Sequence, residues 1–413
     1  MVAKTPPMGW NSWDCYGASV TEETVRKNAD YMAKNLKEFG YEYIVVDIQW
    51  YQPTADTHEY KNCADLTMDE YGRLLPAVNR FPSSKEGNGF KNLGDYLHSL
   101  GLKFGIHIMR GIPRQAVHTN TKIKGTNLTA RDIAQANSIC YWNPDMYGVN
   151  AKAEGASEYY HSLFALYAEW AVDFVKVDDI AREFHYEEID LIRDAIDHCG
   201  REMVLSISPG ASPLDQAEYF KQKVNMWRIT DDFWDQWDLL SAMFERAEKW
   251  AAHAGAGHWP DADMLPVAGI NQCYGEDSWT KFTEDELKTM MTLWCFLRSP
   301  LMIGSELTKL DDFTLKLLTN PDLLTMLSAS FSARQIYRRN EEICWLSIGK
   351  AGGYYLAFFN TSDKEKNLDI DLSALEMDGV SKSFDLWSKD ADEIADSLTI
   401  KVKSHGVRAF FIS

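Results

Sequence analysis

The strongest constraint on the fold is a pattern that repeats about eight times in roughly the first 320 residues. Each repeat has a short apolar run, a polar residue where the run ends, and then an amphipathic helical segment. Residues 43–47 and 172–180 are such runs, and residues 6–13 are predicted as the first strand. Residues 21–39 form such a helix, which begins after Thr21 and stops at Gly40, and residues 233–254 are predicted as another. Alternating strands and helices predict a parallel α/β barrel, (β/α)8. A doubly wound open sheet is the alternative, but no glycine-rich phosphate-binding sequence follows any of the strands.

The pattern changes after residue 327. Five short alternating runs follow, separated by Gly, Asn, Asp and Ser, at residues 343–348, 354–359, 368–372, 397–402 and 407–412. They predict an antiparallel β-sandwich. We therefore expect a catalytic barrel over residues 1–327 and a C-terminal antiparallel β-domain over residues 328–413. Residues 110–155 are too long for an ordinary strand–helix connection, which indicates a functional loop over a pocket or an inserted structural hairpin.

Charge and cysteine usage exclude several classes of protein. The net charge is -19 over 413 residues, which argues against nucleic acid or an anionic membrane as a partner. The seven cysteines are scattered without a CxxC pair, so neither a zinc site nor a disulfide framework is indicated. Free thiols, no apolar run near ~20 residues and no N-terminal signal sequence predict a cytoplasmic protein. A secreted protein whose signal was removed stays open, as does a homo-oligomer.

Polar residues end the predicted strands one after another. In a barrel these residues gather on one rim, although they are far apart in the sequence. In chain order they are Trp13, Asp47, His107, Asp178, Ser208, Asp232 and Asp263. This periodicity predicts an active site at the rim.

The most informative strand end lies in residues 172–180. Lys176 and Asp178 share one face of the strand because side chains alternate. A lysine beside a carboxyl lowers the carboxyl pKa by roughly 1–3 units, so Asp178 is a candidate ionised nucleophile. A structural salt bridge at the strand terminus is the alternative.

A second cluster covers residues 227–235. Arg228 and Asp232 share parity there, among the aromatic residues Trp227, Phe233 and Trp234. An ionised carboxylate and a protonated carboxylic acid are what glycoside hydrolysis requires, and the aromatic setting favours the protonated form of Asp232. A metal site would call for fewer cations and for nearby histidines, so we predict no metal and no cofactor.

Several motifs resemble glycoside hydrolase family 27, the family of α-galactosidases and α-N-acetylgalactosaminidases. In order they are Pro6-Pro7-Met8-Gly9-Trp10-Asn11-Ser12-Trp13, Tyr71-Gly72-Arg73-Leu74, Arg80-Phe81-Pro82, Gly101-Leu102-Lys103-Phe104-Gly105-Ile106, Lys176-Val177-Asp178, Trp227-Arg228 with Asp232 and Asp235, Trp259-Pro260-Asp261-Ala262-Asp263-Met264-Leu265, and Pro300-Leu301-Met302-Ile303-Gly304. The resemblance implies a (β/α)8 barrel with an antiparallel β-domain and a retaining mechanism. It places the nucleophile on Asp178 and the acid/base on Asp232, which follows the family's arginine by four positions. It places sugar binding on Trp13, Asp47, Lys176, Arg228 and Asp263.

The chain departs from the family pattern at the sugar site. Ile48 follows Asp47 where the family has a second aspartate, and His107 replaces a frequent tyrosine. The family's disulfide cysteines near this region are absent. Ser208 and Ala211 are small, as in the family members that admit a 2-acetamido group, whereas Ile48 suits a pentose or another hexose.

We therefore expect a retaining exo-α-glycosidase that acts on terminal galactose-type sugars, with a tilt towards α-N-acetylgalactosamine. An α-galactosidase or a β-L-arabinopyranosidase of the same family is an alternative. A catalytically silent carbohydrate-binding protein and a metal-dependent sugar isomerase are alternatives from other classes. For each of the glycosidases and for the carbohydrate-binding protein, the partner is a carbohydrate.

Overall fold

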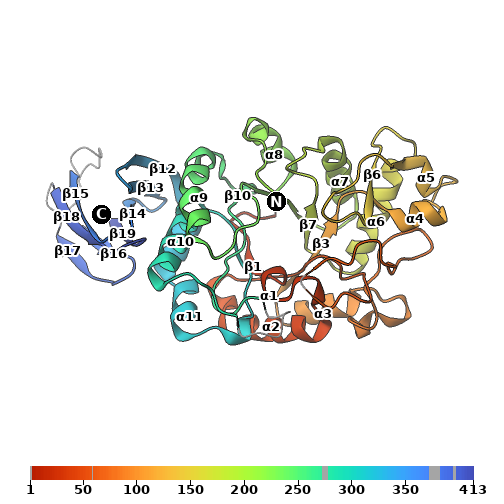
Figure 1. Ribbon diagram of the computed structural model, residues 1–413, viewed down its shortest axis with the longest axis horizontal. Coiled ribbons are helices and arrows are strands. Elements are labelled where there is room, and N and C mark those ends of the chain that lie inside the picture. The colour runs from red at the N-terminus through yellow and green to blue at the C-terminus, as the bar shows by residue number, and fades with distance from the viewer. Residues whose placement is uncertain (1, 58, 272–277, 372–381, 394–396) are drawn as a thin grey trace.

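The computed structural model describes residues 2–57, 59–271, 278–371, 382–393 and 397–413. The chain forms a large α/β part and a smaller β part, which lies at the left in Figure 1. Among the described residues, none of the helices combines the length and apolar character needed to cross a bilayer. The six described cysteines are all free thiols, and Cys273 lies outside the described residues.

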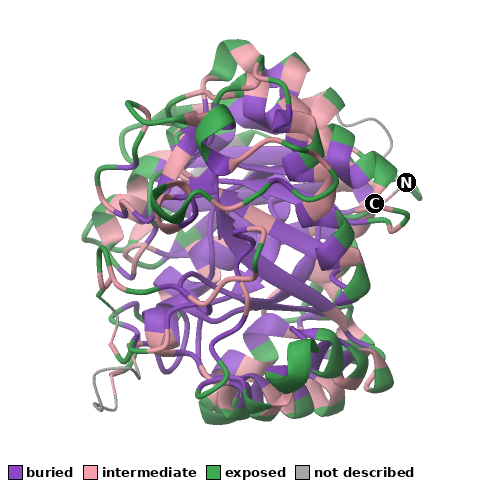
Figure 2. Cartoon of the chain, turned by 90° about the vertical axis from the view of Figure 1, so that its right-hand side faces the viewer, coloured by how far each residue is buried: buried purple, intermediate pink, exposed green. Residues whose placement is uncertain are grey.

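Eight parallel strands form the barrel. In spatial order they are β10 (Trp259–Asp261), β9 (Met226–Arg228), β8 (Val204–Ile207), β7 (Phe174–Asp178), β3 (Lys103–Met109), β2 (Tyr43–Val46), β1 (Met8–Asn11) and β11 (Leu301–Ile303). A parallel bridge between Leu265, just beyond β10, and Ile303 of β11 joins the two ends of the sheet. The predicted (β/α)8 barrel is therefore confirmed. Figure 2 shows the strands as a buried centre, with exposed residues on the surrounding helices.

Helices surround the barrel between the strands. They are α1 (Trp13–Tyr16), α2 (Glu22–Asn35), α3 (Lys91–Ser99), α6 (Ala156–Glu169), α7 (Tyr186–His198), α8 (Ala217–Lys223), α9 (Trp237–Trp250), α10 (Glu284–Leu297), α11 (Asp312–Leu318) and α12 (Pro321–Ala329). Thr21 caps α2 as predicted, and Thr283 caps α10 in a reciprocal capping box with Glu286. Helix α10 is buried on nearly all sides because the β part covers its outer face.

The structure differs from the prediction at two elements and adds one helix. The predicted first strand, 6–13, spans only Met8–Asn11, and Trp13 begins α1. The predicted helix 233–254 begins only at Trp237, because the Phe233 N–H donates to the Asp263 carboxylate in an irregular segment. Helix α12 was not predicted.

The long segment after β3 is a small inserted unit. It contains β4 (Ile112–Pro113), α4 (Arg114–Thr119), α5 (Ala130–Ile133), β5 (Ala134–Gln135) and β6 (Met146–Val149), with β6 between β4 and β5. Arg110 at its start donates to the carboxylates of Asp179 and Glu188. The insertion is therefore attached to the barrel rim beside the end of β7.

The C-terminal part is a sandwich of two antiparallel sheets. Its strands are β12 (Ser330–Arg339), β13 (Glu342–Gly349), β14 (Tyr354–Asn360), β19 (Val407–Ile412), β16 (Lys382–Asp385) and β17 (Ala391–Glu393) in one sheet, and β15 (Lys366–Asp371) and β18 (Ser397–Val402) in the other. All five predicted strands are present, although residue 372 lies outside the described residues. Strands β12, β16 and β17 were not predicted. Leu346 and Phe358 face the small sheet, whereas Trp345 and Phe359 join the barrel core, as alternation along a strand requires.

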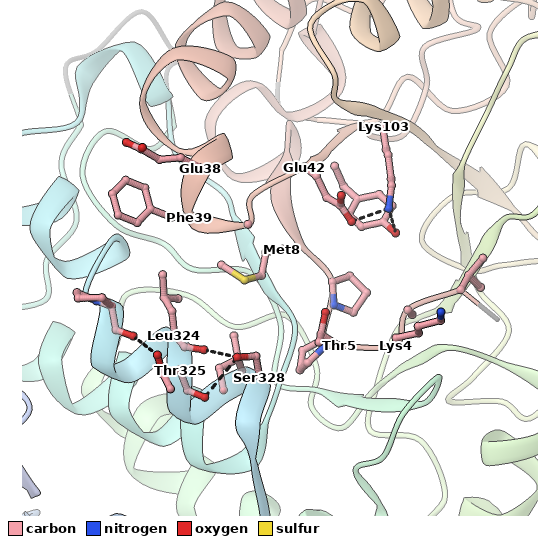
Figure 3. A pocket seen from close by; sticks show the side chains of 18 of the residues that line it. Lys4, Thr5, Met8, Glu38, Phe39, Glu42, Lys103, Leu324, Thr325 and Ser328 are labelled. Carbon is pink, nitrogen blue, oxygen red and sulfur yellow. Dashed lines mark hydrogen bonds and ion pairs between the residues drawn. The ribbon is translucent and has the colours of Figure 1, made fainter. Parts of the chain in front are cut away.

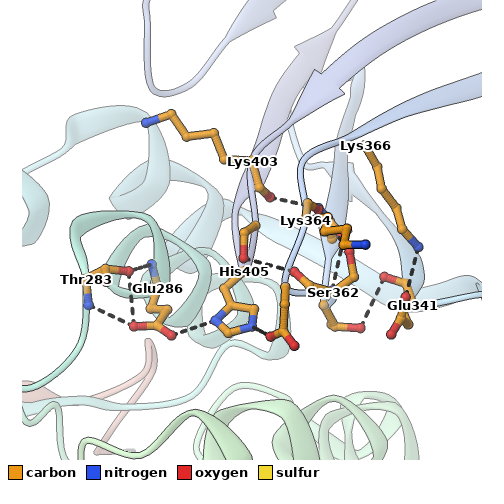
Figure 4. Close-up of polar contacts among 12 residues, drawn as sticks. Thr283, Glu286, Glu341, Ser362, Lys364, Lys366, Lys403 and His405 are labelled. Carbon is orange, nitrogen blue, oxygen red and sulfur yellow. Dashed lines mark hydrogen bonds and ion pairs between the residues drawn. The ribbon is translucent and has the colours of Figure 1, made fainter.

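One histidine joins the two parts. His405 stacks on Trp237 of α9 with ring centroids 3.7 Å apart. Its Nδ1 lies 2.7 Å from a carboxylate oxygen of Glu286 on α10, and its Nε2 lies 3.0 Å from that of Asp363 (Figure 4). The Thr289 hydroxyl donates to the His405 carbonyl. The β-domain is thus held to the barrel by polar contacts as well as by apolar burial.

Candidate active site

The predicted site residues lie at the carboxyl ends of the barrel strands. Asp47 directly follows β2, His107 lies in β3, Lys176 and Asp178 lie in β7, and Ser208 follows β8. His107 is the register partner of Lys176, and Lys176 that of Ser206, so these strand ends are neighbours. Arg228 ends β9, and Asp263 lies two residues beyond β10.

Asp178 has hydrogen-bond donors on both carboxylate oxygens. Its Oδ2 lies 3.1 Å from His107 Nε2, and its Oδ1 accepts from the Asp179 N–H at 3.0 Å. Burial would raise the pKa of Asp178, but the hydrogen bond and charge of His107, together with Lys176 and the Asp179 N–H, lower the pKa overall. The carboxylate is therefore ionised and held in one orientation.

Lys176 bonds to a different carboxylate from the one that the sequence indicated. Its Nζ donates to Asp47 Oδ2 at 2.9 Å, and Asn11 Nδ2 donates to the same oxygen. Lys176 acts on Asp178 through its charge, whereas the direct partner of Asp178 is His107. Burial would raise the pKa of Asp47, but Lys176 and His107 lower it overall. Asp47, which is buried, and Asp178, which is 14% exposed, thus both lie in the electrostatic field of Lys176.

Arg228 lies between two carboxylates. Its guanidinium contacts Asp232 at 3.0 Å and Asp263 at 2.7 Å. Burial, opposed by Arg228 and reinforced by Asp232 and Asp261, raises the pKa of Asp263 to about 7. Arg228 therefore bridges the buried carboxylate of Asp263 and the exposed one of Asp232, whose side chain is 58% exposed.

Two of the three aromatic residues predicted to surround Asp232 pack elsewhere. Phe233 contacts Trp294, and Trp227 stacks on Phe220 inside the barrel wall. The side chain of Asp232 is largely exposed to solvent and contacts Arg228.

A wall of aromatic rings lies beside the carboxylates. Trp13 stacks on Tyr60 with centroids 5.4 Å apart, and Tyr60 contacts Trp142 of the insertion at 5.5 Å. Burial, followed by the charges of Asp178, Asp47 and Asp232, raises the pKa of the Tyr60 phenol. These three acids therefore lie near one tyrosine, although Asp47 and Asp232 are 185 residues apart in the sequence.

Sequence reasoning missed Tyr60 and Asp14. Tyr60 lies in a loop without periodicity, so only the aromatic-rich segment that contains Trp142 signalled this wall. Asp14 is buried on α1, and its Oδ2 has no hydrogen-bond partner among the residues that the structure describes. Burial, then the charge of Asp263, raises the pKa of Asp14. A signal was available, because Asp14 directly follows the tryptophan-rich motif at the end of β1.

The three positions that bear on the sugar differ in environment. Ile48 is buried, and its N–H donates to Asp47 Oδ1 at 2.8 Å. Ser208 is buried, its hydroxyl has no hydrogen-bond partner within the described part of the chain, and it lines a cavity of about 20 Å³ together with Lys176 and Arg228. Ala211 is exposed.

A larger cavity of about 680 Å³ lies elsewhere, at the opposite end of the barrel. Met8, Tyr43 and Lys103, which begin β1, β2 and β3, line it, and Figure 3 shows Lys103 bonded to Glu42 there. Barrel enzymes carry their chemistry at the carboxyl ends of the strands, so this cavity is not the active site. Among the described residues, the group of His, Cys, Asp and Glu side chains close enough to hold a metal also lies elsewhere, on α6 and α7.

A parallel barrel whose strand ends carry several carboxylates, a largely buried lysine and an aromatic wall is typical of a barrel enzyme that cleaves glycosidic bonds. The family described as alpha galactosidase A matches residues 5–152 and 145–328, and the alpha galactosidase C-terminal beta sandwich domain matches residues 343–412. The chain belongs to glycoside hydrolase family 27.

Solved structures and curated relatives agree with this assignment. A β-L-arabinopyranosidase from Geobacillus stearothermophilus is 56% identical with a TM-score of 0.97, and the match covers 100% of this chain and 97% of that one. A candidate α-N-acetylgalactosaminidase from Bacillus halodurans is 52% identical with a TM-score of 0.91, covering 100% and 98%. Alpha-galactosidase A from Cellvibrio japonicus is 28% identical over 98% of this chain and 91% of its own length.

Proposed function

We propose that this protein is a retaining exo-glycosidase that removes terminal β-L-arabinopyranosyl residues. The observation that carries the proposal is the buried, apolar Ile48 beside Asp47. β-L-Arabinopyranose has the ring configuration of α-D-galactopyranose but lacks the exocyclic hydroxymethyl group. An isoleucine gives such a sugar an apolar contact, whereas a galactose hydroxyl placed there would lose its hydrogen-bond partner. The 56% identity to an arabinopyranosidase supports the same choice.

The chemistry divides between two carboxylates. Asp178 attacks the anomeric carbon and displaces the aglycone oxygen, which takes its proton from Asp232. The Asp232 carboxylate then removes a proton from water, and that water attacks the anomeric carbon and releases Asp178. His107 and the Asp179 N–H orient the nucleophile. The two inversions return the original anomeric configuration.

The neighbouring residues bind the sugar. Asp47, held ionised by Lys176, accepts hydrogen bonds from ring hydroxyls. Asp263 and Arg228 form the opposite side, and Trp13 presents a ring face beside Tyr60. Carbohydrate rings with apolar C–H faces pack well on such an indole.

A second substrate, α-N-acetylgalactosamine, is favoured by Ser208 and Ala211. Their small side chains leave room for a 2-acetamido group, and the relative from Bacillus halodurans carries that assignment. Turnover of three p-nitrophenyl glycosides, β-L-arabinopyranoside, α-D-galactopyranoside and α-N-acetylgalactosaminide, separates the candidates. We expect the highest kcat/KM on the arabinopyranoside, unchanged by EDTA. A higher value on either hexoside contradicts the proposed sugar but not the glycosidase.

Position 48 provides the sharper test. Ile48→Asp restores a polar partner for the hydroxymethyl side of galactose, so we expect the ratio of galactoside to arabinopyranoside kcat/KM to rise by about tenfold or more. Ile48→Val, which stays apolar, is the matched control and keeps the wild-type ratio. An unchanged ratio in Ile48→Asp, with folding verified by circular dichroism, contradicts the role of this residue.

The nucleophile has its own test. Asp178→Asn keeps the shape of the side chain but removes its nucleophilicity, and we expect kcat to fall by roughly 10³–10⁶-fold. NMR of the sugar first released by the wild type reports whether the anomeric configuration is retained. Inversion contradicts the double displacement.

A further inference from the structure

Two histidines and an aspartate meet on the outside of the barrel, away from the active site. His161 lies on α6, and Asp194 and His198 lie four residues apart on α7. The two helices pack side by side (Figure 1). His161 Nε2 lies 2.7 Å from Asp194 Oδ2, and His198 Nδ1 lies 3.3 Å from Asp194 Oδ1. One carboxylate thus lies between two imidazole rings.

The donor set suits a transition metal. One ring nitrogen of each histidine and one carboxylate oxygen lie within 4.8 Å of one another. Imidazole nitrogen and carboxylate oxygen are ligands of Zn²⁺, and three protein ligands plus a water molecule complete its tetrahedral coordination. The 2.7 Å between His161 Nε2 and Asp194 Oδ2 is that of a direct hydrogen bond, which a bound ion would replace, and all three side chains are 40–65% exposed and free to make small rotations.

The orientation of one ring supports metal binding. His198 Nδ1 also lies 2.8 Å from the Asp194 carbonyl oxygen. A ring N–H that donates to a backbone carbonyl leaves the other nitrogen with its lone pair, an arrangement common among metal-binding histidines. Two ligands at i and i+4 share one helix face, and the third comes from the neighbouring helix.

We propose that His161, Asp194 and His198 form a surface site for a divalent transition metal, Zn²⁺ in the first instance, that links α6 to α7. These helices precede and follow β7, the strand that carries Lys176 and Asp178. Metal binding to the folded chain stabilises it by mass action. The site is structural and is independent of the substrate assigned above.

The chain, freed of metal with a chelator, is titrated with Co²⁺, whose visible absorption reports its coordination, and with Zn²⁺ in competition. We expect one ion per chain and a Tm several degrees higher in the presence of metal. His161→Ala, His198→Ala and Asp194→Asn each weaken binding by about tenfold or more. Exposed His118, outside the cluster, provides the matched control, and His118→Ala binds as the wild type does.

Two results overturn the proposal. The first is a wild-type chain that takes up no Co²⁺ at millimolar concentration. The second is a His161→Ala/His198→Ala variant, folded by circular dichroism, that binds metal as tightly as the wild type. Glycosidase activity of the same samples is measured in parallel, and we expect it to be unchanged in the variants.

Discussion

At the residue scale, the adjacent residues Asp231 and Asp232, which look equivalent in the sequence, have different arginine partners in the structure. Asp232 contacts the buried guanidinium of Arg228, whereas Asp231 is exposed and paired with Arg182. Asp232 is thus tied to a buried strand-end residue of the barrel, and Asp231 is not. This difference in partner, rather than in residue type, supports the proposed assignment of the proton transfer to Asp232.

Replacement of the two aspartates tests that difference. We expect Asp232→Ala to lose about 10²–10⁴-fold in kcat/KM on alkyl glycosides, whose leaving groups need protonation, and much less on p-nitrophenyl glycosides. Asp231→Ala, the matched control, keeps activity on both. Equal losses on both substrates in Asp232→Ala count against its role as the acid.

The lowered pKa of Asp178, the proposed nucleophile, makes the stability of the fold depend on pH. The pKa of Asp178 is lower in the folded chain than the ordinary value near 3.9, so its contribution to stability is present above that value and is lost as the pH falls towards the folded pKa. Chemical denaturation between about pH 5 and pH 3 measures the effect. We expect the wild type to lose more free energy of unfolding over this range than Asp178→Asn. Parallel curves for the two proteins contradict the lowered pKa.

At the element scale, α1 packs closely against Gly304, just beyond β11, where there is no room for a side chain. A Cβ on Gly304 would lie 1.9 Å from Asp14 Oδ2. The absence of a side chain at Gly304 therefore leaves the space that the Asp14 carboxyl occupies. The position of α1, which begins with Trp13, depends on this close contact.

Gly304→Ala is expected to lower the free energy of unfolding by about 1–3 kcal/mol, because it overpacks a filled site. It is also expected to reduce kcat/KM through displacement of Trp13. In a Gly304→Ala/Asp14→Ala double variant the clash is removed, so we expect part of the stability to return. A double variant whose loss equals the sum of the two single losses would show that the residues do not interact. Urea denaturation gives these values.

Some strands, helices and site residues could be predicted from the sequence, and others could not. Strand β2 is an uninterrupted apolar run, β3 and β7 are mostly apolar, and α10 begins after a capping threonine, so local signals set their positions. Strand β12 has mostly exposed or half-buried residues and lacks such a signal. In the site, Asp47 and Asp178 were predictable because they end strands. Tyr60 was not, since its place depends on contacts with Trp13 and Trp142, far away in the sequence.

At the scale of the whole molecule, His405 contacts three side chains from both domains. We expect His405→Ala to lower the free energy of unfolding by about 1–3 kcal/mol, because it removes the His405 partner of Glu286 Oε1, in a buried side chain, and leaves Trp237 without its stacked ring. Calorimetry and limited proteolysis between the domains measure the change. His118→Ala is the exposed control, and an equal effect in both variants would contradict a role for His405 at the interface.

Helix α10 lies between the barrel wall and the sandwich, with apolar side chains directed both ways. Deletion of residues 330–413 would expose the apolar face of α10 that includes Phe296 and its neighbours. Such an exposed apolar face promotes aggregation. The sandwich thus behaves as an obligatory cover. Shortened versions of this enzyme therefore have to keep both halves or redesign the exposed helix face.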